Sequence, residues 1–258
     1  MDLIKSRDSK YEEYESLLLS RDQLKKEAGQ IWTVYLQLFG KLITENYEEK
    51  LECIKCKKII AYYQNAINHG GAVDSAAMQK YLDQEMAGYY ENLKRMIQDA
   101  EAANNAGEST PYEVQRSKTL YRRLAKLIHP DINPKTDRSD TLKELWQRIL
   151  IAYHHNDTKA LSELEVMVHK ALNDLGSDKV AVDIPDIENK IDALKVEIDG
   201  IVHSEPYTLR SLVDDSEAAE KKKAEFQKEL ESYQRYHKEL DAVILQMMNS
   251  GGLQIYVQ

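Results

Sequence analysis

Hydrophobic residues recur three and four positions apart along much of the chain, which is the spacing of one face of an α-helix. One such series covers residues 14–42, with Arg21 as a charged exception, and another covers 53–67. The Gly-Gly pair at 70–71 ends this region, because glycine readily terminates a helix. We predict either one bent helix or a hairpin broken near Gly40, since both bury the same stripe, and we favour two helices or one kinked helix.

The most regular spacing lies in the C-terminal third of the chain. Apolar residues repeat every three or four positions over 184–201 and again over 226–247, with a connection at 203–216 between them. Each predicted helix presents one apolar seam, and an antiparallel hairpin is the simplest fold in which each seam covers the other. The tail at 251–257 alternates weakly, as a frayed end or a short strand does. We therefore predict a coiled-coil hairpin over residues 177–258.

Between these regions the sequence predicts four further helices. Their expected bounds are 76–103, 111–128, 139–155 and 157–175. Pro111 suits the first turn of a helix, whereas Pro130 must end the second one, because the residue before a proline avoids helical geometry. A loop at 129–138 then leads into the third. The expected fold is all-α, with residues 1–73, 74–176 and 177–258 as successive regions.

Composition agrees with long helices and narrows the class of protein. Hydrophobic residues make up 42% of the 258-residue chain, and only ten glycines and five prolines interrupt it. The first eight residues lack the apolar core of a secretory signal, and nowhere do about eighteen apolar residues run together, as a membrane span requires. The net charge of −9 argues against nucleic-acid binding. We therefore expect a soluble, cytoplasmic protein with no nucleic-acid or membrane partner.

The two cysteines, Cys53 and Cys56, are spaced C-x-x-C within a predicted helix. Structural zinc usually needs four ligands, and the nearest histidine, His69, brings the candidates only to three. Two reduced helix thiols are the simpler interpretation, so we predict no metal and no cofactor.

The predicted helix at 111–128 has two unlike faces. Its apolar face carries residues at i, i+3, i+4 and i+7, namely Tyr121, Leu124, Ala125 and Ile128. Cations project from the other side at Lys118, Arg122, Arg123 and Lys126. Residues 116–148 hold nine Lys or Arg against four acids, so this segment is +5 in a chain of −9. We interpret the cationic face as a docking surface for an acidic partner, although charged helix faces are often only solvated.

This helix and the loop that follows it resemble the J-domain family. The pattern Tyr121-Arg122-Arg123-Leu124-Ala125, followed by His129-Pro130-Asp131 and then Asn133, has the family's spacing throughout. The next helix matches as well, at Trp146, Ile149, Ala152 and Tyr153. Upstream, Tyr89-Tyr90 with Leu93 resembles the family's first helix, and an insertion around residues 104–110 would explain its greater distance from the loop.

The resemblance implies a co-chaperone that docks on a DnaK-type chaperone and stimulates its ATP hydrolysis. In the family, cations of the second helix contact the ATPase domain, and the His-Pro-Asp loop reaches the interdomain linker region. The resemblance assigns chaperone binding to His129, Pro130, Asp131, Lys118, Arg122, Arg123, Lys126 and Asn133, and packing to Tyr121, Leu124, Ala125, Ile128, Trp146, Ile149, Ala152 and Tyr153. No catalytic residue is expected, because hydrolysis takes place on the partner. The long flanking helices would recruit a specific client protein, and exposed seams would bind it or a second copy of the chain.

Two other functions fit less of the sequence. An enzyme built on His129, Asp131, His154 and His155 has little support, because the adjacent histidines point about 100 degrees apart on a helix and no phosphate loop or nucleophile motif is present. A coiled-coil scaffold with a retained but inactive J-like domain is the stronger rival. Against it, a polar His-Pro-Asp loop is not expected to help helices pack. The co-chaperone interpretation requires that loop to be exposed, so a loop buried beneath the long helices of the same chain would contradict it.

Overall fold

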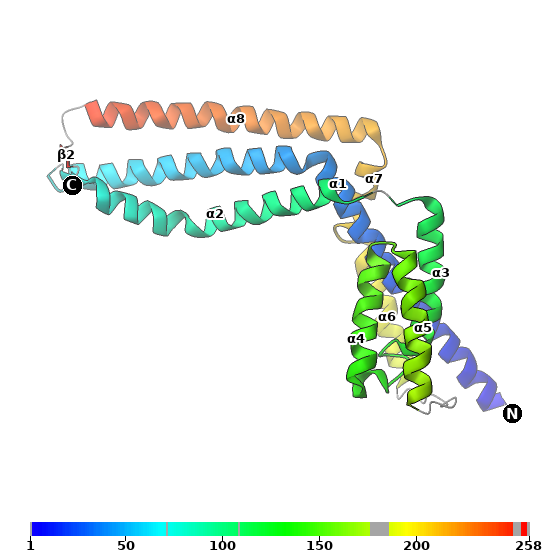
Figure 1. Cartoon of the computed structure of the whole chain (residues 1–258). Coiled ribbons are helices and arrows are strands. Elements are labelled where there is room, and N and C mark those ends of the chain that lie inside the picture. The colour runs from blue at the N-terminus through cyan, green and yellow to red at the C-terminus, as the bar shows by residue number, and fades with distance from the viewer. Residues whose placement is uncertain (1, 71, 108, 176–185, 250–253, 257–258) are drawn as a thin grey trace. The chain divides into compact units, whose positions relative to one another are not determined.

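The structure of the chain is a computed structural model that describes residues 2–70, 72–107, 109–175, 186–249 and 254–256. Within these ranges it has eight α-helices and two three-residue strands (Figure 1). The helices are α1 Asp2–Asn68, α2 Ser75–Asn105, α3 Pro111–Ile128, α4 Asp140–His154, α5 Thr158–Asp174, α6 Ile187–Val202, α7 Arg210–Val213 and α8 Ser216–Asn249. The strands are β1 Ala72–Asp74 and β2 Gln254–Tyr256, and short 3₁₀ turns lie at Thr136–Arg138 and Tyr207–Leu209. The prediction of an all-α protein is confirmed.

Local sequence signals explain the bounds of the central helices. Thr110 and Glu113 form a capping box at the start of α3, and the helix ends just before the segment containing Pro130. The side chains of Ser139 and Asp157 cap α4 and α5 by accepting hydrogen bonds from backbone N–H groups of the first turn. The predicted ranges 111–128, 139–155 and 157–175 agree with the observed helices to within one residue at each end.

The chain divides into two compact units, each assembled from two separate stretches of sequence. The first unit comprises residues 1–30 and 107–208, and the second comprises 31–106 and 209–258. α1 therefore supplies its N-terminal part to the first unit and the remainder to the second. The three consecutive regions predicted from the sequence cut across these units, because contacts distant in sequence decide where each unit closes.

α1 continues without interruption through Gly40, so a hairpin broken at that residue is ruled out. Gly40 instead permits a close approach of α1 to α2. A Cβ atom placed on Gly40 would lie 2.9 Å from the Cβ atom of Ala100. The glycine that suggested a chain break therefore serves helix packing.

Gly40→Ala is expected to destabilise the second unit by about 1 to 3 kcal/mol, because the added methyl group would overlap one that is fixed to the α2 backbone. Gly88→Ala in α2 is the matched control. Nothing lies within 4 Å of a Cβ atom at Gly88, so its better helix propensity should stabilise the protein by about 0.5 to 1 kcal/mol. Urea unfolding, monitored by far-UV circular dichroism, measures the change in free energy of unfolding for both variants. Changes of the same sign in the two variants would contradict the packing role of Gly40.

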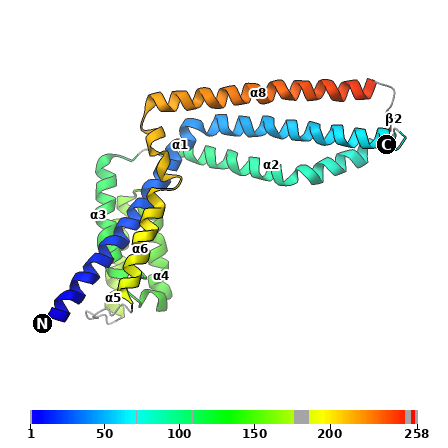
Figure 2. The same ribbon diagram turned by 180° about the vertical axis from the view of Figure 1, so that it is seen from behind.

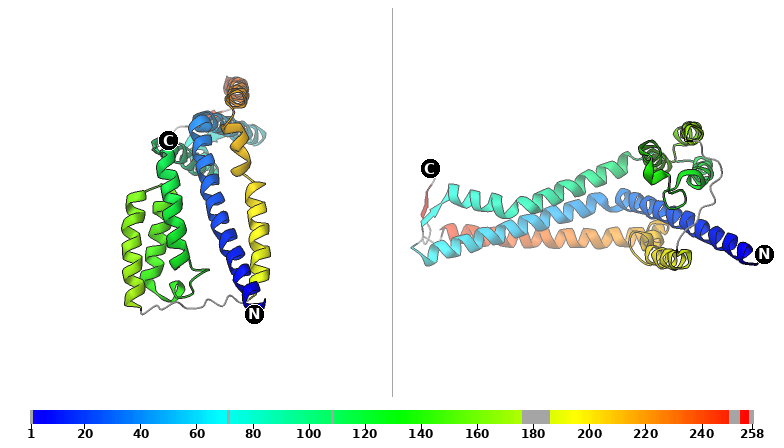
Figure 3. Two further views of the ribbon diagram at one scale, coloured as in Figure 1. Left: turned by 90° about the vertical axis from the view of Figure 1, so that its right-hand side faces the viewer. Right: turned by 90° about the horizontal axis from the view of Figure 1, so that it is seen from below.

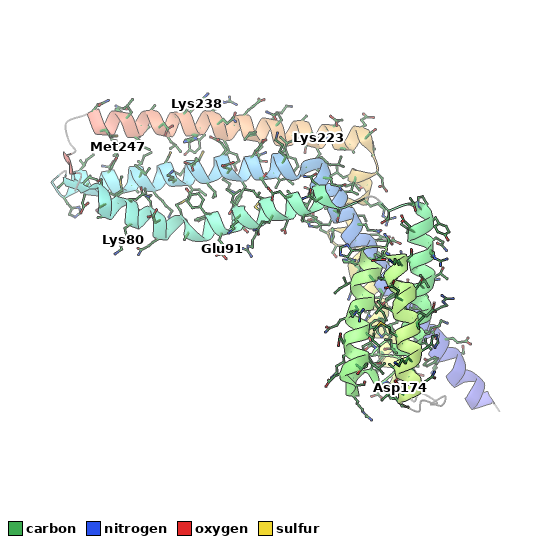
Figure 4. The ribbon with its side chains drawn as sticks, viewed as in Figure 1. Lys80, Glu91, Asp174, Lys223, Lys238 and Met247 are labelled. Atoms are coloured by element: carbon green, nitrogen blue, oxygen red, sulfur yellow. The ribbon has the colours of Figure 1, made fainter. Side chains whose placement is uncertain are left out.

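In the second unit, α1 lies between α2 and α8, and the three helices run side by side (Figures 1 and 3). Leu51 of α1 is buried against Met86 of α2, and Leu240 of α8 is buried against Cys56 of α1. Lys238 lies on the side of α8 that faces away from α1 (Figure 4). The apolar stripe of α1 is therefore covered from two sides.

A small parallel ladder joins β1 and β2 at one end of the second unit. Val73 lies opposite Ile255, and Val73 is completely buried. Of the two alternatives for the tail at 251–257, the short strand is confirmed over Gln254–Tyr256. Residues 251–253 and 257 of that prediction lie outside the described residues.

The predicted hairpin of residues 184–201 with 226–247 is wrong, because α1 covers both seams. Ile191 of α6 is buried against Leu18 of α1 in the first unit, where α6 lies alongside α1 (Figure 2). Leu240 of α8 is covered by α1 in the second unit. A heptad pattern specifies that a face must be covered but not which helix covers it, and α1 is long enough to cover both seams. Residues 184 and 185 of the predicted range lie outside the described residues.

Candidate partner-docking site

α3, α4 and α5 form a three-helix bundle in the first unit, and the N-terminal part of α1 packs against it (Figure 2). All eight residues predicted to pack are buried in one cluster: Tyr121, Leu124, Ala125, Ile128, Trp146, Ile149, Ala152 and Tyr153. Tyr121 stacks on Tyr153 with 4.0 Å between ring centroids and 8° between ring planes. Leu19 of α1 joins the same cluster. These eight residues therefore form part of the core of the first unit.

The His-Pro-Asp loop is not exposed at its histidine, contrary to the prediction. Only 4% of His129 is exposed, and its ring packs edge-on against Trp146 with 4.7 Å between ring centroids, while Pro130 is half-buried. The backbone N–H of Asp131 donates to His129 Nδ1 at 3.1 Å, which puts the proton of the neutral ring on Nε2. That Nε2 lies 3.5 Å from Oδ2 of Asp22 on α1. α1 therefore covers the histidine.

Asp22 is the centre of the contact between α1 and the loop. Its carboxylate accepts a hydrogen bond of 2.6 Å from the Tyr121 hydroxyl and one of 2.8 Å from Arg21. Burial by itself raises the pKa of Asp22, but the bonds from His129 and Tyr121 and the charge of Arg21 outweigh burial and lower this pKa to about 2. A fixed negative charge thus faces the imidazole at neutral pH.

Arg21 connects the same stretch of α1 to the accessible end of the loop. Its guanidinium lies 3.9 Å from the carboxylate of Asp131 and 3.7 Å from that of Glu197 on α6. The Asp131 side chain is 49% exposed, so within the triplet His129-Pro130-Asp131 it is the residue that a partner can reach. Arg21 interrupts the apolar spacing of α1, and a charge in a buried seam was the sequence signal available for this contact. Asp22, the acid beside it, gave no comparable signal.

Ile132 and Asn133, which directly follow the triplet, hold the loop in place. Ile132 is 2% exposed and packs with Leu18 of α1. The side-chain amide of Asn133 donates to the carbonyl oxygen of Leu127 at 2.9 Å, and its side-chain oxygen accepts from the N–H of Lys135 at 3.0 Å. Asn133, predicted to bind the chaperone, therefore has its polar groups engaged within the loop.

The cations of α3 are more accessible than the histidine. Arg122 is exposed. Arg123 forms an ion pair with Glu165 of α5 at 2.9 Å, and Lys126 forms one with Glu15 of α1 at 2.5 Å, yet more than half of each cationic side chain is exposed. Exposed ion pairs contribute only about 0 to 1 kcal/mol, so carboxylates of a partner can replace Glu165 and Glu15 at little cost.

The helix predicted as the first of the J-domain belongs to the other unit, and that prediction is wrong. α2 covers the predicted range 76–103, and its Leu93 packs against Leu51 of α1 in the second unit. Tyr89 and Tyr90, which carried the upstream match, are both exposed. Within the first unit α1 packs on α3 and α4 instead. Helical periodicity alone does not distinguish these two helices as packing partners.

A buried polar cluster beside the candidate site was not indicated by the sequence. Lys26 is 3% exposed, and its Nζ donates to Asn156 Oδ1 at 2.5 Å and to Ser117 Oγ at 3.1 Å. The ammonium also lies 3.7 Å from the centroid of the Tyr153 ring. Burial, with a smaller contribution from the charge of half-buried Lys118, lowers the pKa of Lys26 to about 8. These partners are distant in sequence, so no local pattern brings them together.

Comparison with protein-family models, curated proteins and solved structures finds none that matches this chain. In the described part of the chain, every helix is too short or too polar to cross a membrane.

Proposed function

We propose that the chain is a co-chaperone that docks on a DnaK-type chaperone through the cationic face of α3 and stimulates its ATP hydrolysis. His129 is covered by α1, which contradicts the exposed loop that the sequence interpretation required. The proposal therefore includes a further step, in which the chaperone or a client protein displaces α1 from the His-Pro-Asp loop. The observation that carries the proposal is the accessible row of cations on α3, including Arg122, which leads directly into a loop with a half-exposed Asp131. The resemblance in sequence supplies the class of partner.

Docking of the α3 cations would cost little, whereas access to His129 requires a rearrangement. Freeing the histidine breaks its contact with Asp22 and exposes apolar surface at Ile132 and Leu18. An opening cost of about 3 kcal/mol would reduce the apparent affinity roughly a hundredfold relative to an open form. The covered loop is therefore a resting state, and a ligand that binds the open form preferentially raises activity.

One observation favours a second function, a coiled-coil scaffold with a retained but inactive J-like domain. His129 packs on Trp146 and faces Asp22, so it contributes to the folded state. The triplet thus has a structural use in this chain, which removes the main argument from sequence against a scaffold. Under this second function, neither the wild-type chain nor any variant would stimulate a chaperone.

ATP hydrolysis by a purified DnaK-type chaperone, measured in single turnovers with the whole chain added, distinguishes the two functions. Leu18→Ala removes a fully buried contact of α1 with Ile132 and alters neither the cations nor the triplet. We expect at least a tenfold greater stimulation than by the wild type at the same subsaturating concentration, because about 1.4 kcal/mol in favour of opening is tenfold in population. His129→Gln in the Leu18→Ala chain should abolish this gain.

Leu51→Ala is the control, since it removes an equally buried leucine of α1 in the second unit and should leave stimulation at the wild-type level. If Leu18→Ala unfolds the bundle, Ile191→Ala on α6 loosens the same cover instead. In a Trp32→Phe background, Trp146 emission reports whether α4 remains packed. Absence of stimulation by the wild type and by both loosened chains would contradict the co-chaperone function and support the scaffold. Stimulation that survives His129→Gln would contradict the role of the loop.

A further inference from the structure

Three potential metal ligands come together between α1 and α8 in the second unit. Cys56 is buried on α1, while His237 and Asp241 lie one turn apart on the same face of α8. One donor atom of each residue lies within 4.8 Å of the other two. We predicted no metal from the sequence because Cys53, Cys56 and His69 gave only three candidate ligands. His69 is exposed, with Nδ1 2.8 Å from the carbonyl oxygen of Asn65. The fold replaces it with a histidine from a distant part of the chain.

The separations of these donors suit a tetrahedral zinc ion. Cys56 Sγ lies 3.5 Å from Asp241 Oδ1, and His237 Nε2 lies 3.6 Å from Asp241 Oδ2. Zinc bonds of about 2.0 Å to nitrogen or oxygen and 2.3 Å to sulfur place tetrahedral ligands roughly 3.3 to 3.6 Å apart. These two distances involve different oxygens of Asp241, and with one donor atom from each residue the three atoms lie within 4.8 Å of one another. The side chains would therefore have to close in by roughly one ångström to complete the geometry.

Glu49 fixes the orientation of His237. Glu49 Oε1 lies 2.6 Å from His237 Nδ1, which leaves Nε2 facing Asp241. Histidines that bind a metal usually hold their other ring nitrogen on a carboxylate or carbonyl group, which sets the tautomer and strengthens the ligand. Glu49 therefore stands where the outer carboxylate of a metal-bound histidine is expected, and all four residues are carried by helices.

The charges around the cluster also favour a cation. The carboxylate of Asp241 lies on the Cys56 thiol and that of Glu49 on the His237 ring, so two acids face the cluster. A dication would bind the Cys56 thiolate, displace the thiol proton and neutralise these carboxylates. Cys53, one turn earlier on α1, donates instead to the carbonyl oxygen of Tyr233 at 3.5 Å.

We propose that Cys56, His237 and Asp241 bind a zinc ion, with an exchangeable water as the fourth ligand, and that Glu49 positions His237. Sulfur, nitrogen and oxygen donors together suit zinc, whereas calcium and magnesium take oxygen ligands. The ion joins α1 to α8 and stabilises the second unit by its binding free energy. The site does not depend on the proposed chaperone function, since every ligand belongs to the second unit.

Titration of the reduced whole chain with Zn²⁺ by calorimetry, and with Co²⁺ by absorption, tests the site. We expect one ion per chain, a thiolate-to-cobalt charge-transfer band, and a thermal unfolding midpoint that rises with zinc concentration. Glu49→Gln should weaken zinc binding about 10- to 100-fold. Cys56→Ser and His237→Gln should weaken it further, because each removes a ligand.

Cys53→Ser is the matched control, since it removes the neighbouring thiol of the same helix and should bind zinc as the wild type does. Far-UV circular dichroism shows whether each variant keeps its helices, and Asp241→Asn, at an exposed residue, decides the matter if Cys56→Ser unfolds. The proposal is overturned by absence of stoichiometric binding to the wild type, by equal losses in Cys53→Ser and Cys56→Ser, or by binding that His237→Gln leaves unchanged.

Discussion

Asp22→Ala is expected to lower the free energy of unfolding of the first unit by about 3 to 5 kcal/mol. The change leaves the Tyr121 hydroxyl without its acceptor at 2.6 Å, and Arg21 and His129 lose the carboxylate that they face. These groups are largely shielded from water, so each retains a desolvation cost that no hydrogen bond offsets. A substitution on the open surface would change stability by only about 0.5 kcal/mol.

Trp146 fluorescence makes this measurement specific to the first unit. The chain has two tryptophans, so Trp32→Phe leaves only Trp146, against which His129 packs. Urea unfolding in this background, with and without Asp22→Ala, gives the difference in free energy. Asp22→Asn is the control, because its amide oxygen still accepts from Tyr121 and the loss should be smaller. A loss below about 1 kcal/mol for Asp22→Ala would contradict the central place of this carboxylate.

Urea unfolding at low pH provides a second test on the same two proteins, with and without Asp22→Ala. The pKa of Asp22 in the folded state, about 2, lies below the ordinary value of 3.8, so the unfolded chain takes up this proton at a higher pH than the folded chain. The stabilisation from Asp22 is therefore present above pH 4 and is lost as the pH falls through 2, by about 2 kcal/mol. The difference in free energy of unfolding between wild type and Asp22→Ala should therefore shrink by about 2 kcal/mol as the pH falls from 4 to below 2.

The buried ammonium of Lys26 is expected to make the first unit more stable by about 3 kcal/mol as the pH rises from 8 to 10.5. Burial lowers the pKa of Lys26 from 10.5 to about 8. Between these values the unfolded chain holds a proton on Lys26 that the folded chain has released, so raising the pH favours the folded state. Below pH 8 both states carry the charge, and the cost of burying it is present in full.

Lys26→Met removes the titrating group while keeping an unbranched side chain, and urea unfolding followed by Trp146 measures the difference from wild type at each pH. Tyr121 and Tyr153, whose pKa values burial raises above the ordinary range, titrate alike in both chains and cancel. Lys25→Met, at an exposed neighbour, should keep the rise in stability. Parallel curves for wild type and Lys26→Met between pH 8 and 10.5 would show that Lys26 does not titrate there.

The sequence predicted the structure well where short-range signals determine it. The early-helix preference of Pro111 and the helix-ending effect of Pro130 are local, and the predicted bounds of α3, α4 and α5 agree with the structure to within one residue. The eight core residues followed from the apolar face of each helix in the same way. Such features depend on neighbours within about one helical turn, and these are visible in a single sequence.

Long-range pairing could not be predicted in this way. The seam at Ile191 and the seam at Leu240 have the same periodicity, and either would be satisfied by any helix with an apolar stripe. The packing of α1 over His129 was not predicted for the same reason. Arg21 was the one indication, because it is a charged residue within the apolar series of α1. The pairing of Lys26 with Asn156 joins residues far apart in the chain. Asn156 has a left-handed backbone conformation, but the residue type alone predicts neither this conformation nor the pairing with Lys26.

The uninterrupted course of α1 through both units has a consequence for protein synthesis. The apolar stripe around Cys53 and Cys56 leaves the ribosome early, but the helix that covers it begins only at Ser216. Until then the nascent chain presents an uncovered seam, which is the kind of surface that drives aggregation. A chain terminated prematurely before α8 would therefore be prone to aggregate, because the apolar surface around Cys53 and Cys56 stays uncovered until that helix has been translated.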